Sequence, residues 1–218
     1  MLKSTIVVVE KRGASYPKMH DFRPAIKYPE YIFKNDISDS KNDAYELVRT
    51  AFYKAGYDTK NYGTEKWNPL GEFIDIGDNV VLKPNLVMHI NKSGDSEDCL
   101  YTHPSVVAAV IDYVIIALHG KGKIIVGDAP IQNCDFDYLV RESGYDELVK
   151  YYKNQGVDIC LVDFRELSSY VKRGIRYNVI NGQASGKIID LGDESEFTGS
   201  KKKYLNNLRI TNYDPHIL

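Results

Sequence analysis

The sequence lacks the apolar segments and the charge excess that would tie it to a membrane or to nucleic acid. Its 218 residues have a formal net charge of −2, so neither nucleic acid nor an anionic membrane is an expected partner. The apolar run at the start is too short for a signal peptide. The very apolar stretch 106–118 is too short to span a bilayer and contains Asp112. We therefore interpret this stretch as a buried helix.

Cysteine is scarce. The three cysteines, Cys99, Cys134 and Cys160, lie far apart, and no pair has the spacing of metal ligands. Their odd number argues against a framework of disulfides. Reduced thiols in a cytoplasmic protein are the simplest interpretation.

Several well-known catalytic motifs are also absent. The sequence contains no Walker-type phosphate loop, no Gly-x-Gly-x-x-Gly, no Gly-x-Ser-x-Gly elbow and no Cys-x-x-Cys. These absences argue against a standard NTPase, a dinucleotide-dependent dehydrogenase, a serine hydrolase and a self-contained iron–sulfur protein.

What the sequence has in abundance is tyrosine, with 17 residues. Tyrosine suits half-buried positions, because its ring is apolar and its hydroxyl can face water or a partner. Two interpretations stay open, a bias of composition and a tyrosine-rich interaction surface.

The N-terminal third predicts one clear helix. Residues 5–10 predict a short strand, and residues 11–35, with three prolines and no clear period, predict an ordered arm or a long loop. Residues 42–57 predict a helix, because apolar residues recur there at three- and four-residue spacing and Gly56 is a suitable stop signal.

Strands and helices alternate in the middle of the chain. We expect strands at 79–83, 123–128 and 157–163, and helices at 103–119 and 135–154, the latter broken at Gly144. This order predicts a parallel sheet with right-handed crossovers. Because the strands are apolar on both faces, we expect an α/β fold with a doubly wound sheet and helices on both faces.

The C-terminal part predicts a β-rich extension. Short strand candidates occur at 177–180, 187–191 and 208–211, separated by Gly, Asn and Ser. A chain of this length fits one sizeable domain. We therefore expect a single α/β domain over residues 1–218, with a core at about 75–165 and an extension at 166–218 that could begin a lobe missing from this chain.

A lysine at the end of an apolar strand is the first sign of a functional site. Residues 80–87 read VVLKPNLV. Proline cannot donate to a sheet ladder and holds the preceding residue extended, so Lys83 should be the last residue of its strand. Ligands of open α/β sheets bind at the carboxyl ends of the strands.

Three segments should meet at this edge of the sheet: 83–85, 102–105 and 127–130. The start of the helix offers backbone N–H groups to a phosphate or carboxylate, and Lys83 adds a cation. His103 could act as a general acid or base or as a metal ligand, and Asp128 could bind a metal, accept a hydroxyl or orient His103. Lys83, His103 and Asp128 are therefore the candidate catalytic residues.

Four neighbours are candidate ligand contacts: Asn85, Thr102, Ser105 and Gly127. Glycine would let a ligand approach the backbone closely. Structural explanations stay open, since Thr102 or His103 could cap the helix, Ser105 could be an ordinary first-turn residue, and Asn85 and Asp128 could build turns. Likewise, Lys83 could pair with a structural carboxylate.

Three segments together resemble a known family. VVLKPNLV, THPSVVAAVIDYV and GKGKIIVGDAP, in this order and spacing, are similar to the family catalogued as domain of unknown function number 362. The resemblance is specific over residues 79–130 and weaker as far as Asp163, and LRITNYDP near the end also resembles a family segment. Members of this family tend to be longer than this chain.

The resemblance implies an α/β fold whose biochemistry is unsettled. Related sequences are sometimes associated with surface-polysaccharide gene sets, which implies a link to that metabolism. Some relatives carry a ferredoxin-like cluster domain, but the cysteine motif of that domain is absent here. No iron–sulfur cofactor therefore carries over to this chain.

Three functions are expected. The first is an enzyme-like domain that binds a small anionic ligand, a phosphate or carboxylate, at the strand edge. The second is a non-catalytic protein-interaction or assembly module built on the tyrosine-rich surface and the proline-rich arm. The third is a metal-dependent enzyme using His89, His103 and Asp128. The substrate, the reaction and any cofactor stay open, and the sequence is compatible with a homo-oligomer.

Overall fold

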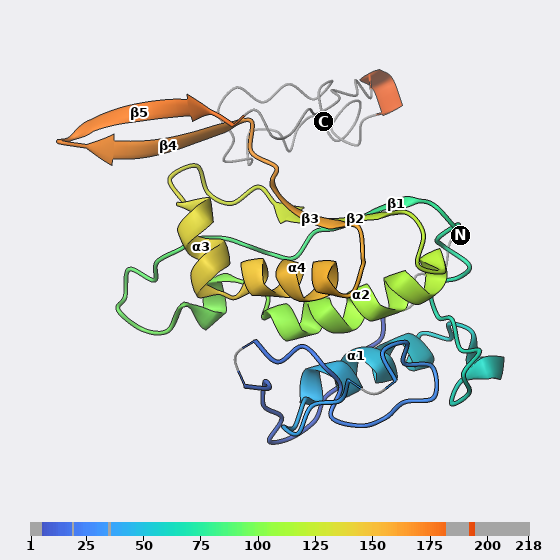
Figure 1. Cartoon of the computed structure of the whole chain (residues 1–218). Helices are drawn as coiled ribbons and strands as arrows, with labels where there is room; N and C mark the ends of the chain where they lie inside the picture. Colours follow the sequence, from blue (N-terminus) through green and yellow to red (C-terminus); the bar gives the residue numbers. More distant parts are fainter. Residues whose placement is uncertain (1–5, 19, 35, 182–191, 195–218) are drawn as a thin grey trace. The chain divides into compact units, whose positions relative to one another are not determined.

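The computed structural model describes residues 6–18, 20–34, 36–181 and 192–194. The chain divides into two compact units, residues 1–183 and 184–218. In the second unit the described residues form one short 3-10 helix, η3 (Gly192–Glu194). The elements of the first unit are α1 (Asp43–Lys54), η1 (Thr59–Asn61), β1 (Asn79–Leu82), η2 (Glu97–Leu100), α2 (Pro104–Leu118), β2 (Lys123–Asp128), α3 (Phe136–Glu142), α4 (Tyr145–Asn154), β3 (Ile159–Asp163), β4 (Leu167–Lys172) and β5 (Ile175–Ile180) (Figure 1).

Strands β1, β2 and β3 form one parallel sheet in sequence order. Val80 pairs with Ile124, Ile124 pairs with Ile159, and Asp128 lies opposite Asp163 at the carboxyl ends. Parallel neighbours need long crossovers, which α2 and then α3 and α4 provide. The expected α/β class with a parallel sheet is confirmed.

The crossover helices cover one face of this sheet. Val80, Ile124 and Val126 pack in the main core with buried residues of α2, α3 and α4, and Figure 1 shows these helices on one side of the strands. On the other face Val81 is 55 % exposed and Ile125 is only partly buried. Both crossovers pass on the same side, so the described strands show neither the reversal of order nor the second helical layer expected of a doubly wound sheet.

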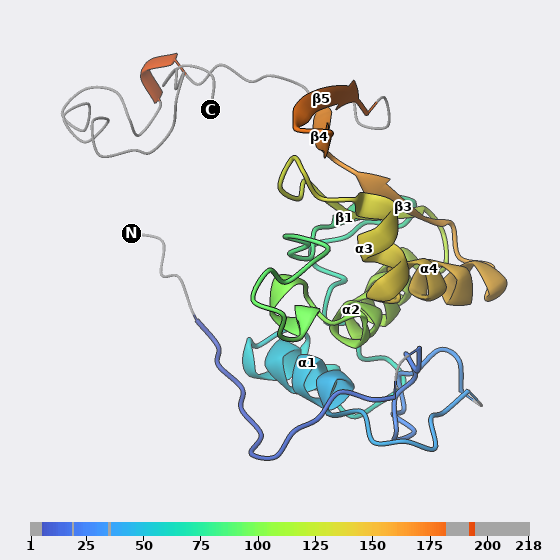
Figure 2. The same cartoon turned by 90° about the vertical axis from the view of Figure 1, so that its left-hand side faces the viewer.

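Helix α2 lies between the sheet and α1, as both Figure 1 and Figure 2 show. Its second face packs into an aromatic cluster formed by Tyr31, Tyr45, Trp67, Ala109 and Tyr113. The helix begins at Pro104 and is followed by His119 with a φ of 52°, close to the predicted bounds. Among the described helices, α2 included, none combines the length and apolar character needed to cross a membrane.

A buried arginine organises the N-terminal aromatic residues. Arg49 Nε donates to Glu30 Oε1 at 2.6 Å, and Arg49 Nη1 donates to Tyr62 Oη at 2.6 Å. The guanidinium also lies 4.4 Å from the ring centroids of Tyr28 and Tyr62. Five further tyrosines are at most 2 % exposed: Tyr31, Tyr45, Tyr113, Tyr145 and Tyr152. Much of the tyrosine content therefore builds the core, which leaves less of it for the expected interaction surface.

The strand predictions at the two ends of the chain need correction. The described residues 6–10 form no strand, and Ile6 is 86 % exposed because no described strand pairs with it. The sequence predicts the end of β5 but not β4, its antiparallel partner. Arg173 and Gly174 connect the two strands with φ angles of 51° and 78°, the left-handed pair that suits a two-residue hairpin loop. The strands predicted at 187–191 and 208–211 lie outside the described residues.

Helix α2 carries a buried carboxyl group, that of Asp112. Asp112 is 1 % exposed, and its Oδ1 accepts a hydrogen bond from Tyr152 Oη at 2.7 Å. Burial raises the pKa of Asp112 from its ordinary value of 3.8 to about 7. At a pH between 3.8 and about 7, Asp112 keeps its proton in the folded protein and loses it in the unfolded chain. The contribution of Asp112 to stability therefore falls as the pH rises towards 7.

We expect the substitution Asp112→Asn to remove this pH dependence. Urea unfolding should show that the gain in stability is on the order of 2 kcal/mol larger at pH 8 than at pH 5, since one pKa unit corresponds to about 1.4 kcal/mol. The exposed Asp158→Asn serves as the control and should change little at either pH. An equal effect of Asp112→Asn at both pH values would contradict the raised pKa.

Candidate functional site

The three predicted segments meet at the carboxyl edge of the sheet. Lys83 Nζ lies 2.8 Å from Asp128 Oδ1, and Leu86 N donates to Asp128 Oδ2 at 2.7 Å. Asn85 N donates to Thr102 Oγ1 at 3.1 Å, and Thr102 N donates to Asn85 O at 2.8 Å. Hydrogen bonds and an ion pair thus join the chain after β1 to the end of β2 and to the residues before α2.

Asp128 is the buried centre of this junction, with 6 % of its surface exposed. Besides the bond from Leu86 N, its carboxylate accepts a hydrogen bond from Ala129 N at 2.8 Å. Its backbone oxygen accepts from Phe164 N at 2.8 Å, which brings in the chain after β3. Asp128 therefore has a structural role, because its carboxylate and its backbone oxygen bind the chain after all three strands. Within the described residues no hydrogen bond joins it to His103.

Lys83 is the exposed member of the ion pair. Its side chain is 56 % exposed, against 9 % for Asp128, and β1 ends one residue before it, at Leu82. An ion pair of this exposure contributes about 0–1 kcal/mol. A hollow of about 300 Å³ adjoins the lysine, and its lining includes Asn85 and Thr102. The ammonium group can therefore leave Asp128 at small cost, because two backbone donors still satisfy the carboxylate.

His103 caps α2. Its Nδ1 lies 2.8 Å from Ser105 Oγ and accepts a hydrogen bond from Ser105 N at 3.3 Å. The ring stacks on Tyr16 with 4.0 Å between the centroids. Burial lowers the pKa of His103, although the Asp98 carboxylate acts in the opposite direction. The imidazole is therefore neutral near pH 7, and one of its nitrogens is committed to the cap.

The start of α2 has no free N–H group for an anion in its first turn. Pro104 lacks an N–H, Ser105 N donates to the His103 ring, and Val106 N donates to His103 O at 3.0 Å. Ser105 is only 1 % exposed, so it is a buried first-turn residue. The helix start therefore gives no support to the anion contact that the sequence predicts there.

Gly127 leaves room for the protein's own chain. A Cβ at this position would overlap Val162 O and would come within 2.9 Å of the Phe164 ring. The neighbouring strand β3 and the residue after it thus occupy the space that the sequence assigns to a ligand. Gly127 is required by the packing of β2 against β3 and Phe164.

A second cavity, of about 690 Å³, lies at the carboxyl end of β3, beside the chain that leads into α3. Asp163 and Arg165 line it together with residues of β4 and of the α3 start. The sequence reasoning does not identify this cavity, because it does not predict β4. A usable signal existed: charges follow an apolar strand at Asp163 and Arg165, as one does at Lys83.

The described residues contain no group of three or more His, Cys, Asp or Glu side chains that could hold a metal ion. His89, one of the proposed ligands, accepts a hydrogen bond from Asp135 N at its Nδ1, at 3.0 Å. His103 and Asp128 are engaged as described above. The geometry therefore gives no support to the metal-dependent alternative.

The two partners of the ion pair should differ in their effect on stability. We expect Asp128→Ala to lower the free energy of unfolding by roughly 2–4 kcal/mol, because it leaves Leu86 N without its acceptor in the interior. Lys83→Met should cost less than about 1 kcal/mol. Chemical denaturation of both variants at one pH measures this difference. Equal losses would show that the ion pair itself holds the edge together.

Comparison with known proteins gives one family match and one relative. The model described as "Domain of unknown function (DUF362)" matches residues 80–183. The "Thylakoid-associated protein sll1697" of Synechocystis sp. is 36 % identical over 121 residues, which cover 55 % of this chain and 34 % of that protein. The match thus spans about a third of the relative's length. No solved structure matches the chain. The segment that matches the DUF362 model, residues 80–183, is slightly less than half of the chain and holds the Lys83–Asp128 junction.

Proposed function

We propose that this protein is an enzyme-like domain that binds a small anionic ligand, a phosphate or a carboxylate, through Lys83 at the carboxyl edge of the parallel sheet. The observation that carries the proposal is the asymmetry of the Lys83–Asp128 pair. The carboxylate is buried and fixed by backbone donors, whereas the ammonium group is exposed beside a hollow.

This asymmetry favours exchange of partners at Lys83. When the ammonium turns to a ligand, it gives up a weak, partly solvated ion pair and gains a charge-assisted hydrogen bond to the anion. Asp128 keeps the hydrogen bonds from Leu86 N and Ala129 N. Asn85 and Thr102 are the other polar residues in the lining of the hollow, which is otherwise apolar, and they can contact the ligand's remaining groups.

A second candidate is the non-catalytic interaction module. It is supported by the internal engagement of His103 and Asp128, which leaves the edge without a ready acid–base pair. The relative from Synechocystis is named for an association with the thylakoid, a name compatible with such a role. We place either function in the cytoplasm, which suits the three free cysteines of the described residues.

The anion proposal is tested by thermal unfolding of the whole chain in inorganic phosphate or acetate, with chloride matching the ionic strength. We expect either ligand to stabilise the wild type, by about 2.7 kcal/mol at a concentration 100 times its dissociation constant. Lys83→Met should abolish this gain, and Lys83→Arg, which keeps the charge, should preserve most of it. The exposed Lys153→Met is the matched control and should behave like the wild type.

Two results would overturn the anion proposal. One is stabilisation that persists in Lys83→Met, which would place any bound anion elsewhere. The other is the absence of stabilisation in the wild type, which would favour the interaction module. Because Lys83→Met is expected to fold, a loss of binding in this variant can be separated from a loss of structure.

A further inference from the structure

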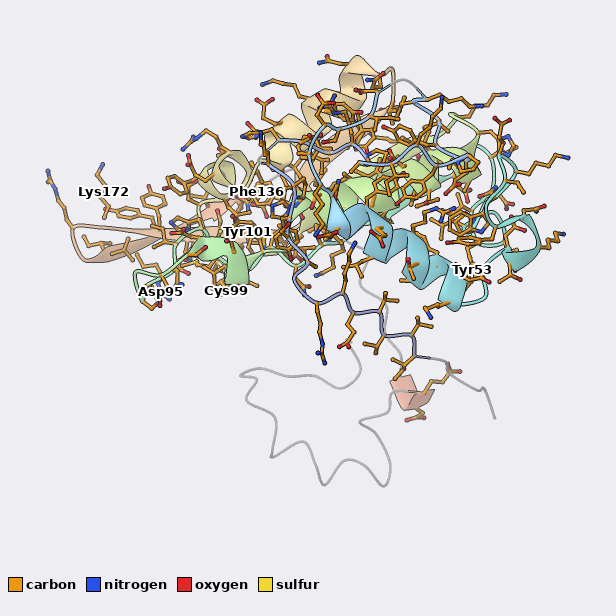
Figure 3. All side chains as sticks on the ribbon, turned by 90° about the horizontal axis from the view of Figure 1, so that it is seen from below. Tyr53, Asp95, Cys99, Tyr101, Phe136 and Lys172 are labelled. Carbon is orange, nitrogen blue, oxygen red and sulfur yellow. The ribbon has the colours of Figure 1, made fainter. Side chains whose placement is uncertain are left out.

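The cavity of about 690 Å³ is bounded by two segments that are distant in sequence. One wall is the chain that leads into α3, residues 133–137, and the other is β4 of the hairpin. In Figures 1 and 2 the β4–β5 hairpin comes after β3 and lies beyond the loop that precedes α3. Phe136, from the first wall, is labelled in Figure 3. The volume of the cavity is in the range of pockets that hold small molecules.

A buried ion pair fixes both walls. Arg165 Nη2 donates to Asp163 Oδ2 at 2.6 Å, and Arg165 Nη1 donates to Cys134 O at 2.9 Å in the first wall. Asn181 Nδ2 donates to Asp163 Oδ2 at 3.2 Å and so anchors the base of the hairpin. Ser169 N donates to Gln132 O at 2.7 Å and joins β4 to the loop directly. The cavity is therefore formed before any ligand arrives.

The charges of the lining favour a cation. Asp163 neutralises the charge of the Arg165 guanidinium. The guanidinium also donates hydrogen bonds to three backbone oxygens, those of Ile131, Gln132 and Cys134. Two further carboxylates, Asp135 and Asp137, line the cavity without a cationic partner among the described residues. Asp135 is the N-cap of α3, where its Oδ1 accepts from Tyr138 N at 3.0 Å, and Asp137 lies in the first turn. The negative charge of both still repels an anion and attracts a cation.

Two aromatic residues line the same cavity. Phe136 lies between the two aspartates in sequence, and Tyr170 from β4 is 50 % exposed in the opposite wall. The Tyr170 ring is held by stacking on Tyr177, with 5.2 Å between the centroids. Ring faces attract ammonium and guanidinium groups, and the carbon chain of an organic amine packs on them.

We propose that this cavity is a second ligand site and that it binds a small organic amine. Asp135 and Asp137 supply the carboxylates that accept from the ammonium group, and Phe136 and Tyr170 supply the rings. The site differs from the one at Lys83 in its residues and in the sign of its charge. It does not depend on the anion proposal.

The test uses three four-carbon probes of similar length and different charge: putrescine, butanediol and succinate. Amide chemical shifts of the isotope-labelled whole chain are followed during each titration at fixed ionic strength. We expect putrescine to move the amide signals of residues 133–137 and 168–171, and the other two probes to leave them unchanged. The location of the shifts separates this site from any binding at Lys83.

Charge-removing variants complete the test. Asp135→Asn keeps an N-cap residue, and Asp137→Asn keeps the size of the side chain. Each should weaken putrescine binding about fivefold, in line with the loss of one partly exposed ion pair. The exposed Glu72→Gln, away from the cavity, is the control and should bind like the wild type.

Several outcomes would overturn the proposal. Butanediol or succinate moving the same signals as putrescine would remove the role of charge. Unchanged putrescine affinity in both aspartate variants would place the amine elsewhere. The absence of any shift with putrescine would exclude a small-amine site in this cavity. The spectra themselves report whether each variant is folded.

Discussion

The carboxyl edge of the sheet depends on one buried carboxylate. Asp128 accepts hydrogen bonds from Leu86 N after β1 and from Ala129 N after β2, while its backbone oxygen holds the chain after β3. Backbone donors of irregular loops must find acceptors when they are buried, and here one side chain serves two of them. The position of Lys83 is a consequence, since its ammonium group approaches the same carboxylate from the solvent side.

The sequence predicted the place of this junction better than its chemistry. A lysine and an aspartate at the ends of neighbouring parallel strands must lie at one edge, so Lys83 and Asp128 could be brought together by topology alone. Whether their polar atoms face a ligand depends on local hydrogen bonds, which no spacing reveals. The His103 ring caps its own helix by accepting from Ser105 N, and the absence of a side chain at Gly127 leaves space for Phe164.

The fold shows the same limit. The apolar strands and capped helices of the middle region were predictable because period and end signals act locally. The cover of helices on one face alone was not predictable, since it depends on the face of the sheet over which each crossover passes. The hairpin also escaped prediction, because serines interrupt β4 and its only strong signal is the Arg173–Gly174 loop. The cavity beside the Asp163–Arg165 pair depends on that hairpin.

The aromatic cluster on the outer face of α2 has a consequence for where the domain can be cut. The family match begins at residue 80, yet Ala109 and Tyr113 of the matched helix are buried by Tyr31, Tyr45 and Trp67 from the preceding chain. A fragment trimmed to the family boundary would present this helix face to water and would tend to aggregate. The unit that buries its apolar surface is therefore larger than the segment that the family model matches, because residues before position 80 cover this face of α2.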